Sequence, residues 1–590
     1  MKYISLLCLF MLSGWRLYAQ VIPLSPLEPA TSALQHMQMS VDSGNEMHSS
    51  HQYYTRENIL QFLSRHPKVL KTQNRYDVQY LLDELDESDG LLDKYNFNSA
   101  EVPDTIFEDS THHFYSLSTP VISTPSFTKN KKPLFGFLYK TPGSMLSIDV
   151  PDFYLRLDPV IHFRYGKSAG EVDQNVFSNI RGFEMRGGIS DRVFFSGSLH
   201  ESQEGYPAYV NNYISAHKAV PGAGFYKPYS SSVINLQGYD FLNAHGLIGF
   251  HILKPITLQF GHGRNFIGDG IRSLFLSDFG ANYLYLKLNT KLWIFDYQNL
   301  WCQLQYSGRI DNDHEIPKKY MAAHHLSLNI FKWLNVGLFE SIVFSRTNHF
   351  EFQYLNPIIF YRAIEQLVGS PDNANVGIDF KVRAGSSVQL YGQWLIDELI
   401  INNLIKNNGW WGNKNGLQLG LKYINVGGID HLDLQLELNR VRPYTYTHTD
   451  LNANYTHYNQ PLAHPLEANF TELLARVRWM PINNLFVEPR LMYALKGEDD
   501  PALESTYGGN IFIPNTRRIQ DFDNTMLQGI KSTRIIAGLD ISYMWYHNMF
   551  VDLSFSQRRF TAEGVEIPSL KENIFTLGLR INAARRTLDF

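Results

Sequence analysis

The sequence predicts an all-β protein, an antiparallel transmembrane β-barrel of about 16–18 strands with a small N-terminal α-helical element on its periplasmic side. Three observations predict this fold. Apolar and polar residues alternate with a period of two along most of the chain beyond residue 133. Short turns and long polar connections succeed one another between these stretches. The N-terminus has the pattern of a secretory signal peptide, which directs a chain out of the cytoplasm.

Residues 1–19 are interpreted as the signal peptide. Lys2 supplies a short positive region, Tyr3 to Leu12 form an apolar run, and Ala19 is a small residue at the cleavage point. Such a run is too short to cross roughly 30 Å of hydrocarbon as a helix. Its removal would leave Cys302 as the single cysteine, which excludes an intramolecular disulfide.

Residues 20–133 are expected to form a flexible and helical periplasmic region. Val21 to Ser50 is rich in Pro, Ser, Met and His without a period, which is typical of a flexible lead. Two helices are predicted after it, one capped by Thr55 and the other by Asn74. The acidic run from Asp83 to Asp89 is interpreted as a solvated helix end rather than as a site for a metal or a cationic partner.

Composition narrows the class of protein further. The hydrophobic fraction of 44%, the mean hydropathy of −0.24 and the lack of any run of about 18 apolar residues exclude a helical membrane protein. Aromatic residues make up 14% and charged residues 18%, a balance typical of amphipathic strands with rings at membrane interfaces. A net charge of −5 excludes the broad basic field that binds nucleic acid.

Residues 134–590 are predicted to form the barrel. In the stretch 153–166, one strand face is apolar and the other carries Arg156, Asp158, His162 and Arg164. Charged groups cannot lie in an apolar core without a large desolvation cost, so they need water or one another. A soluble β-sandwich has the same period, and the sequence does not say which face points inward. Whether Arg156, Arg164 and Arg181 fill the lumen is the question that distinguishes a plugged barrel from an open channel.

The connections between strands fall into two classes. Short ones are predicted at Gly188–Asp191, Lys254–Pro255, Lys332–Asn335, Gly385–Ser386, Pro481–Asn484 and His547–Asn548. Long polar ones are predicted at Glu201–Ser232, His262–Ala281, Gly308–Tyr320, Arg442–Asn469 and Lys496–Lys531. Outer-membrane barrels have this asymmetry, with short periplasmic turns and long loops outside.

The glycine-rich segment 261–270 suggests a phosphate site at first. It contains neither G-x-G-x-x-G nor a G-K-[ST] ending, so a nucleotide site is not predicted, and a close-packed loop is favoured. Three charged residues in or just after this segment, Arg264, Asp269 and Arg272, are expected to line the lumen or a groove, or to hold a strand-to-loop corner or a sugar. Asp311–Glu315 lacks the glycine and the distal glutamate of an EF-hand, and no metal site is predicted.

The segment 441–470 is the richest in candidate ligands. Aromatic faces stack on sugar rings, and Asn, Asp, His and Tyr bind hydroxyls. The predicted carbohydrate-binding residues are Tyr444, Tyr446, His448, Tyr455, His457, Tyr458 and His464, together with Arg264, Asp269 and Arg272. The alternative is an ordinary long loop folded over its own aromatic residues. No G-x-S-x-G elbow occurs, so no enzyme activity is expected. The Ser, Asp and His groups of a barrel hydrolase would come from distant strands, and this alternative stays open.

Four stretches carry a family resemblance: LNPIIFYRAIEQLVGSPDNANVGIDF (355–380), LYGQWLIDEL (390–399), GWWGNKNGLQLGLKY (409–423) and VRPYTYTHTDLNANYTHYNQPLAHP (441–465). The chain resembles the Wzi-like capsule-assembly outer-membrane barrels, most closely their gliding-motility branch in Bacteroidetes. The resemblance covers most of the barrel region. It implies about eighteen strands, a periplasmic helical element and a lectin-like role in holding surface polysaccharide or in gliding, without assigned catalytic residues.

The function expected from the sequence is therefore polysaccharide binding at the cell surface by an outer-membrane barrel. Expected partners are outer-membrane lipid, surface polysaccharide, other surface or motility proteins and the barrel-assembly machinery, since Phe590 follows the last strand, Ile574–Asn582. No cofactor, metal or nucleic acid is expected. The alternative functions are a channel for small solutes and a barrel hydrolase.

Overall fold

The structure is a computed structural model of the chain. It describes residues 28–41, 48–51, 54, 56–66, 75–85, 139 and 143–590, except 172, 191, 232–235, 307–314, 347–348, 359, 370 and 565–566. The signal-peptide interpretation of residues 1–19, the end of the acidic run beyond Leu85 and most of the segment 311–315 lie outside these described residues.

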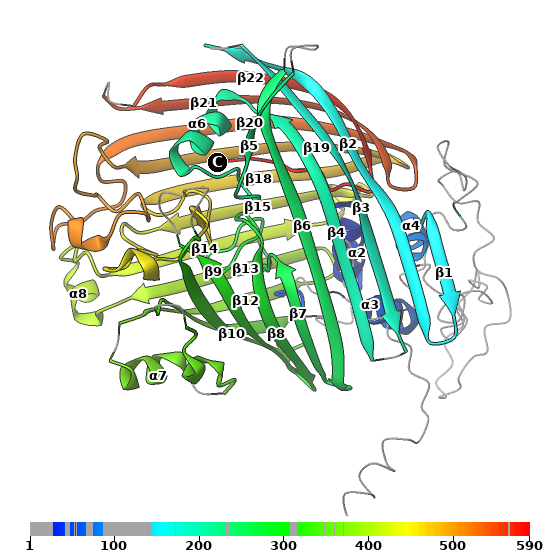
Figure 1. The fold of residues 1–590 in the computed structure, drawn as a ribbon, viewed down its shortest axis with the longest axis horizontal. Coiled ribbons are helices and arrows are strands. Elements are labelled where there is room, and N and C mark those ends of the chain that lie inside the picture. The colour runs from blue at the N-terminus through cyan, green and yellow to red at the C-terminus, as the bar shows by residue number, and fades with distance from the viewer. Residues whose placement is uncertain are drawn as a thin grey trace, which may run out of the picture.

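Eighteen antiparallel strands form a closed barrel, which confirms the predicted fold. The barrel strands are β2 (Phe153–Gly170), β3 (Gln174–Ile189), β4 (Val193–Gly205), β6 (Leu236–Leu253), β7 (Ile256–Gly263), β8 (Tyr283–Leu292), β9 (Phe295–Gln305), β10 (Lys318–Phe331), β11 (Leu334–Phe344), β12 (Asn373–Ala384), β13 (Val388–Glu398), β14 (Lys414–Tyr423), β15 (Leu432–Val441), β18 (Phe470–Ile482), β19 (Leu485–Glu498), β20 (Ile530–Tyr546), β21 (Met549–Ala562) and β22 (Leu570–Ile581). Each pairs with its neighbours in chain order, and β22 closes the sheet by pairing with β2 (Figure 1). Two further short strands lie beside barrel strands as antiparallel partners: β1 (Leu146–Val150) pairs with β2, and β5 (Lys227–Ser231) pairs with β6.

The six predicted short turns all lie at one end of this barrel, called here the short-turn end. Antiparallel strands reverse direction at each turn, so the long connections gather at the opposite, long-loop end. Three short helices lie in these long connections: α6 (Ala208–His217), α7 (Tyr361–Leu367) and α8 (Ile401–Lys406) (Figure 1). The predicted asymmetry of the connections is therefore confirmed.

The outward side of the wall is apolar. Large exposed apolar side chains recur on the strands, among them Phe163, Tyr165, Phe183, Met185, Leu417, Leu419, Leu473, Leu491, Leu553, Phe555, Phe575 and Leu577. Exposed tryptophans stand in or near the short turns: Trp293, Trp333, Trp479 and Trp545. An apolar band bordered by an aromatic girdle is typical of barrels that span a membrane. Among the described residues, no helix is long and apolar enough to cross a membrane.

The inward side of the same strands carries ion pairs. Asp158 accepts from Arg186 at 3.1 Å, and Arg580 donates to Asp552 at 2.7 Å. Arg156 and Arg164 share this side, as predicted. Arg181 does not share it. On β3, Arg181 is opposite Ile161, whose side chain points outward, and it lies half exposed beside Glu201 on the outer side. Of the three arginines in question, Arg156 and Arg164 therefore face the lumen and Arg181 does not.

Three N-terminal helices lie between the walls at the short-turn end: α2 (Glu28–Ser40), α3 (Arg56–Arg65) and α4 (Arg75–Leu85) (Figure 1). The two predicted helices correspond to α3 and α4. The flexible lead predicted for Val21–Ser50 is wrong over α2. Ala30, Leu34 and Met37 of α2 are fully buried with apolar residues of α3 and α4, at a spacing that fits one helix face.

The rest of the lumen is filled by segments that fold inward. Residues 264–282 and 442–469, from two long loops, share one core cluster with inward side chains such as Leu300 and Met321. After β22, residues 583–590 run up inside the barrel, where the Phe590 ring packs on Tyr209 and Tyr213 of α6 (ring centroids 5.6 and 4.9 Å). Phe590 therefore fills the lumen and does not continue the last strand.

Candidate functional site

The loop 442–469, predicted to bind carbohydrate, lies inside the lumen. Tyr446 and Tyr455 are almost completely buried and stack at 5.7 Å between centroids. Their hydroxyls donate to the backbone carbonyls of Leu274 and Phe275, each at 2.8 Å. The two tyrosines therefore fasten this loop to the inserted segment 264–282. This arrangement is the alternative weighed from the sequence, a loop folded over its own aromatic residues.

The backbone of this loop adopts conformations that bulky residues rarely adopt. Tyr444 and Tyr446 have φ of 66° and 72°, in the left-handed region. Such conformations persist only where surrounding contacts over-determine them. Tyr444 supplies such contacts, since its backbone N–H donates to Gly508 and its hydroxyl to the carbonyl of Thr506 at 2.9 Å.

The histidines of the loop are bonded in the same way. His457 accepts from the backbone N–H of Gln305 at 3.0 Å, and burial lowers its pKa to about 4. His464 lies 2.8 Å from Glu472, and burial lowers its pKa against the raising effect of that carboxylate. Tyr458 is buried, and His448 is half exposed at the outer rim. Carbohydrate binding by the buried members of the predicted set stays a prediction, and it requires the loop to open.

The three charged residues of the glycine-rich segment hold corners of the fold. Arg264 donates to the carbonyl of Asp278 at 2.9 Å, and Arg272 pairs with Glu472 at 3.3 Å. Asp269 accepts from Ser49 of the N-terminal segment and lies 3.9 Å from Lys381 of β12. Burial opposes ionisation of Asp269, but the lysine charges and serine hydrogen bonds outweigh it and lower its pKa.

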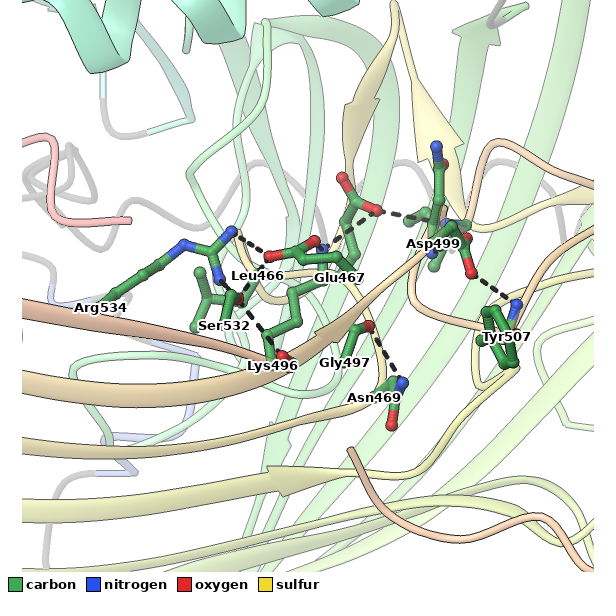
Figure 2. A network of polar contacts seen from close by, with 12 residues as sticks. Leu466, Glu467, Asn469, Lys496, Gly497, Asp499, Tyr507, Ser532 and Arg534 are labelled. Atoms are coloured by element: carbon green, nitrogen blue, oxygen red, sulfur yellow. Dashed lines mark hydrogen bonds and ion pairs between the residues drawn. The ribbon is translucent and has the colours of Figure 1, made fainter. Parts of the chain in front are cut away.

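A polar network fixes two long loops to the rim of the barrel (Figure 2). Lys496 of β19 lies 3.8 Å from Glu467 of the loop 442–469 and 3.5 Å from Glu498. At the start of the loop 499–529, Asp499 accepts from Thr506 and from backbone N–H groups of that loop. Asn469 donates to the carbonyls of Gly497 and Gln528, so it joins both loops. Groups at this outer surface are therefore held on a rigid base.

A half-exposed aromatic patch stands on that base. Trp410 and Trp411, in the connection between β13 and β14, lie 5.9 Å apart. The Arg518 guanidinium lies 4.4 Å from the Trp411 ring centre, and the backbone N–H of Trp411 donates to the backbone carbonyl of Asp521 at 2.9 Å. The Asp521 carboxylate pairs with the Arg518 guanidinium. His448 is joined to the same loop through its backbone carbonyl, which accepts from the backbone N–H of Asn515, three residues before Arg518.

We call Trp410, Trp411, His448, Arg518 and Asp521 the tryptophan patch. It places partly exposed indole rings beside the Arg518 guanidinium, which is itself paired with the Asp521 carboxylate. Aromatic rings and charged groups of this kind bind sugar rings and hydroxyls. Of these five residues, only His448 belongs to the set predicted from the sequence. A signal for the two tryptophans was present in the string GWWGN, where they stand among Gly and Asn, but no signal in the sequence pointed to Arg518 and Asp521.

One group of side chains has metal-binding composition. His36 of α2, Asp77 of α4 and His431 of the turn before β15 bring their ligand atoms within 4.8 Å of one another. Each imidazole already faces a carboxylate, His36 to Asp433 at 3.0 Å and His431 to Asp77 at 3.3 Å. The two rings stack in parallel at 4.9 Å, whereas the ligands of one ion converge on it. The arrangement docks the helices on the turn.

Together, these features define a membrane-spanning β-barrel of the outer-membrane type. Its lumen is filled, and hydrogen bonds hold its long loops against the rim.

No protein-family model matches the sequence, and neither does any curated protein. Among solved structures, the fold is similar to Wzi, an outer-membrane protein involved in group 1 capsule assembly in Escherichia coli and a carbohydrate-binding β-barrel. Identity is 14%, the TM-score is 0.45, and the match covers 74% of this chain and 85% of that one.

Two Pseudomonas aeruginosa structures are also similar. OccK8 (OprE) matches at 8% identity and TM-score 0.40, over 72% of this chain and 97% of that one. OprD matches at 12% identity and TM-score 0.38, over 72% and 94%. These similarities concern the fold alone and do not indicate which function this chain has. A closer relation to the gliding-motility branch stays a prediction.

Proposed function

We propose that this protein is a cell-surface polysaccharide-binding barrel of the outer membrane, which supports capsule attachment or gliding and catalyses no reaction. The observation that carries the proposal is the tryptophan patch on its rigid base. A sugar ring binds best to an aromatic face that is already positioned, because little conformational entropy is lost on binding. The guanidinium beside Trp411 remains charged at any physiological pH, and its pairing with the Asp521 carboxylate holds both groups in place for hydrogen bonds to sugar hydroxyls.

The filled lumen agrees with a binding role. Between the walls lie helices at the short-turn end, two inserted loops in the middle and residues 583–590 beside them. The loop 442–469 supports the patch from below, since Trp411 lies edge-on to Tyr444 at 6.2 Å. Deleting this loop would therefore remove the base of the site together with its buried residues, so point substitutions in the patch are the cleaner test.

The test is binding of polysaccharide extracted from the producing cells to the full-length protein in detergent micelles. Trp410→Ala with Trp411→Ala is expected to weaken binding by about tenfold, which corresponds to about 1.4 kcal/mol for the lost stacking. Trp293→Ala is the matched control, because that ring is 84% exposed at the short-turn end. Equal affinity of the double variant and the control, with both barrels folded, would exclude the patch as the site.

A solute channel is the second candidate function, and one observation favours it. A cavity of about 90 Å³ remains between the wall and residues 583–590, lined by charged side chains that include Arg164, Glu204, Arg490, Asp552 and Arg558. This volume holds several water molecules. Ion conductance of the full-length protein in planar bilayers would support the channel, and a silent bilayer would support the binding role.

A further inference from the structure

A row of polar residues crosses the outer side of the barrel wall. Asn299 of β9 is paired with His324 of β10, and His324 with Glu340 of β11, so the three lie at one height. Successive side chains of a strand point to opposite sides. His325, the neighbour of His324, points into the lumen and bonds His51 of the N-terminal segment, so His324 and its two partners in the row point away from the lumen. On a wall that otherwise faces hydrocarbon, an uncovered row of this kind carries a large desolvation cost.

One long loop folds down over this row. We call residues 351–369 the lip, which contains the 3₁₀ turn η3 (Phe352–Leu355) and α7. The Tyr361 ring lies 4.0 Å from the His324 ring, and the backbone N–H of Arg362 donates to Glu340 at 3.0 Å. Asn299, His324 and Glu340 are consequently 1%, 6% and 5% exposed, although they lie outside the lumen.

The lip is fixed to the wall at several points. Tyr297 of β9 donates to the carbonyl of Pro357 at 2.6 Å, and the Trp301 indole donates to that of Tyr354 at 2.9 Å. At its base, Arg346 binds Asp372 with two hydrogen bonds of 2.7 and 2.8 Å. The position of the lip against the outer wall is therefore set by bonds on both sides of it.

The other side of the lip exposes several large apolar side chains, next to the exposed Gln353, Arg362 and Gln366. Phe352, Ile358, Phe360 and Leu367 are 76%, 82%, 73% and 81% exposed. The α8 helix, in the next connection at this end, adds exposed Ile401 and Ile405. Isolated exposed apolar residues are common, but a group of this size marks a surface that something covers.

We propose that the lip is embedded in the membrane, where lipid acyl chains cover Phe352, Ile358, Phe360 and Leu367. The argument is continuity with the lipid-facing wall. Leu338 of β11 and Ile378 of β12 are exposed on the same outer side, on the two strands that the lip connects. The lip thus replaces a polar stretch of wall by an apolar one, as amphipathic segments at membrane interfaces do.

Depth-dependent quenching tests the proposal. Single cysteines are placed at Ile358 and Leu367 of the full-length protein in which both Cys8 and Cys302 are replaced by alanine. Each variant is labelled with an environment-sensitive fluorophore and reconstituted in phosphatidylcholine vesicles containing nitroxide-labelled lipid. Leu577→Cys, on the exposed wall, is the lipid-facing reference, and Glu504→Cys, on an exposed loop, is the aqueous reference. Quenching of both lip labels is expected within about twofold of the wall label, as for an interfacial segment.

Each other outcome overturns the proposal. Lip labels quenched by aqueous iodide, as the label at Glu504 is, would place the lip in water. Labels shielded from both iodide and nitroxide lipid would place it against protein, either a second copy of this chain or another partner. Heat-modifiable migration in gels confirms that each variant is a folded barrel before its label is read.

Discussion

Replacing Tyr455 with phenylalanine removes one hydroxyl and leaves the ring of the filled lumen in place. The structure assigns this hydroxyl to the loop and not to a ligand, since it donates to the Phe275 carbonyl at 2.8 Å in a side chain that is 1% exposed. We expect Tyr455→Phe to loosen the inserted loops modestly and to leave polysaccharide binding at the tryptophan patch nearly unchanged.

The magnitude follows from the contacts. Loss of a buried hydrogen bond that leaves a carbonyl without this donor lowers the free energy of unfolding by about 1–2 kcal/mol. Tyr455→Ala removes the ring as well, including its stacking on Tyr446 at 5.7 Å. Large-to-small changes of buried aromatic residues cost about 3–5 kcal/mol. The alanine variant should therefore be less stable than the phenylalanine variant by about 2–3 kcal/mol.

The assay pairs two measurements on full-length protein in detergent micelles. Thermal unfolding gives the order of stability, wild type above Tyr455→Phe above Tyr455→Ala, and limited proteolysis reports whether residues 442–469 have left the lumen. Polysaccharide affinity is measured on the same samples. If Tyr455→Phe loses polysaccharide binding while its loop stays protease-resistant, the hydroxyl serves a ligand, and the structural interpretation of this tyrosine is wrong.

Two more predictions concern the N-terminal segment that lies inside the barrel and contains the helices α2, α3 and α4. Burial lowers the pKa of His48 to about 3, and the Asp296 charge opposes this shift only in part. The N-terminal segment is therefore held in the barrel most strongly above pH 6.5, and its binding to the barrel weakens as the pH falls toward 3. The free energy changes by at most about 1.4 kcal/mol per pH unit. His48→Gln should flatten the pH dependence of proteolysis in residues 28–85, and an unchanged slope would contradict the assignment. Glu84 of α4 accepts from Asn548 and lies 2.8 Å from His547 at a short turn, so Glu84→Ala leaves both without this partner. This variant should release α4 to protease at least several times faster, with Glu504→Ala, on an exposed loop, as the neutral control.

The sequence predicted the candidate site less well than the fold. The loop 442–469 has the composition of a surface loop that binds sugars. Its Tyr446, Tyr455 and His464 are nevertheless buried. Composition describes what a side chain is able to bond, and the structure shows that other parts of the chain already make those bonds. Trp410 and Trp411 were visible in the sequence, but their position beside Arg518, more than a hundred residues away, depends on the folded loops.

The same division holds for the helices. The two helices with charged first turns and a regular apolar face were predicted, and α2 was missed because its Ser, Met and His content resembles a flexible segment. What stabilises α2 is contact with α3 and α4 inside the barrel, where Leu34 and Met37 are fully buried. Tertiary packing, and not local preference, decides such a helix.

By itself, the sequence determined that the chain forms many antiparallel strands, where the short turns lie and that the long connections gather at one end. These are local properties, because successive side chains of any strand point to opposite sides. Only the tertiary structure decided which side meets lipid and which meets the lumen. On β9 the apolar Leu300, Cys302 and Leu304 face inward against the inserted loops, while Trp301 faces outward beneath the lip. Alternation fixes the two faces of a strand, but what covers each face depends on segments far away in the chain.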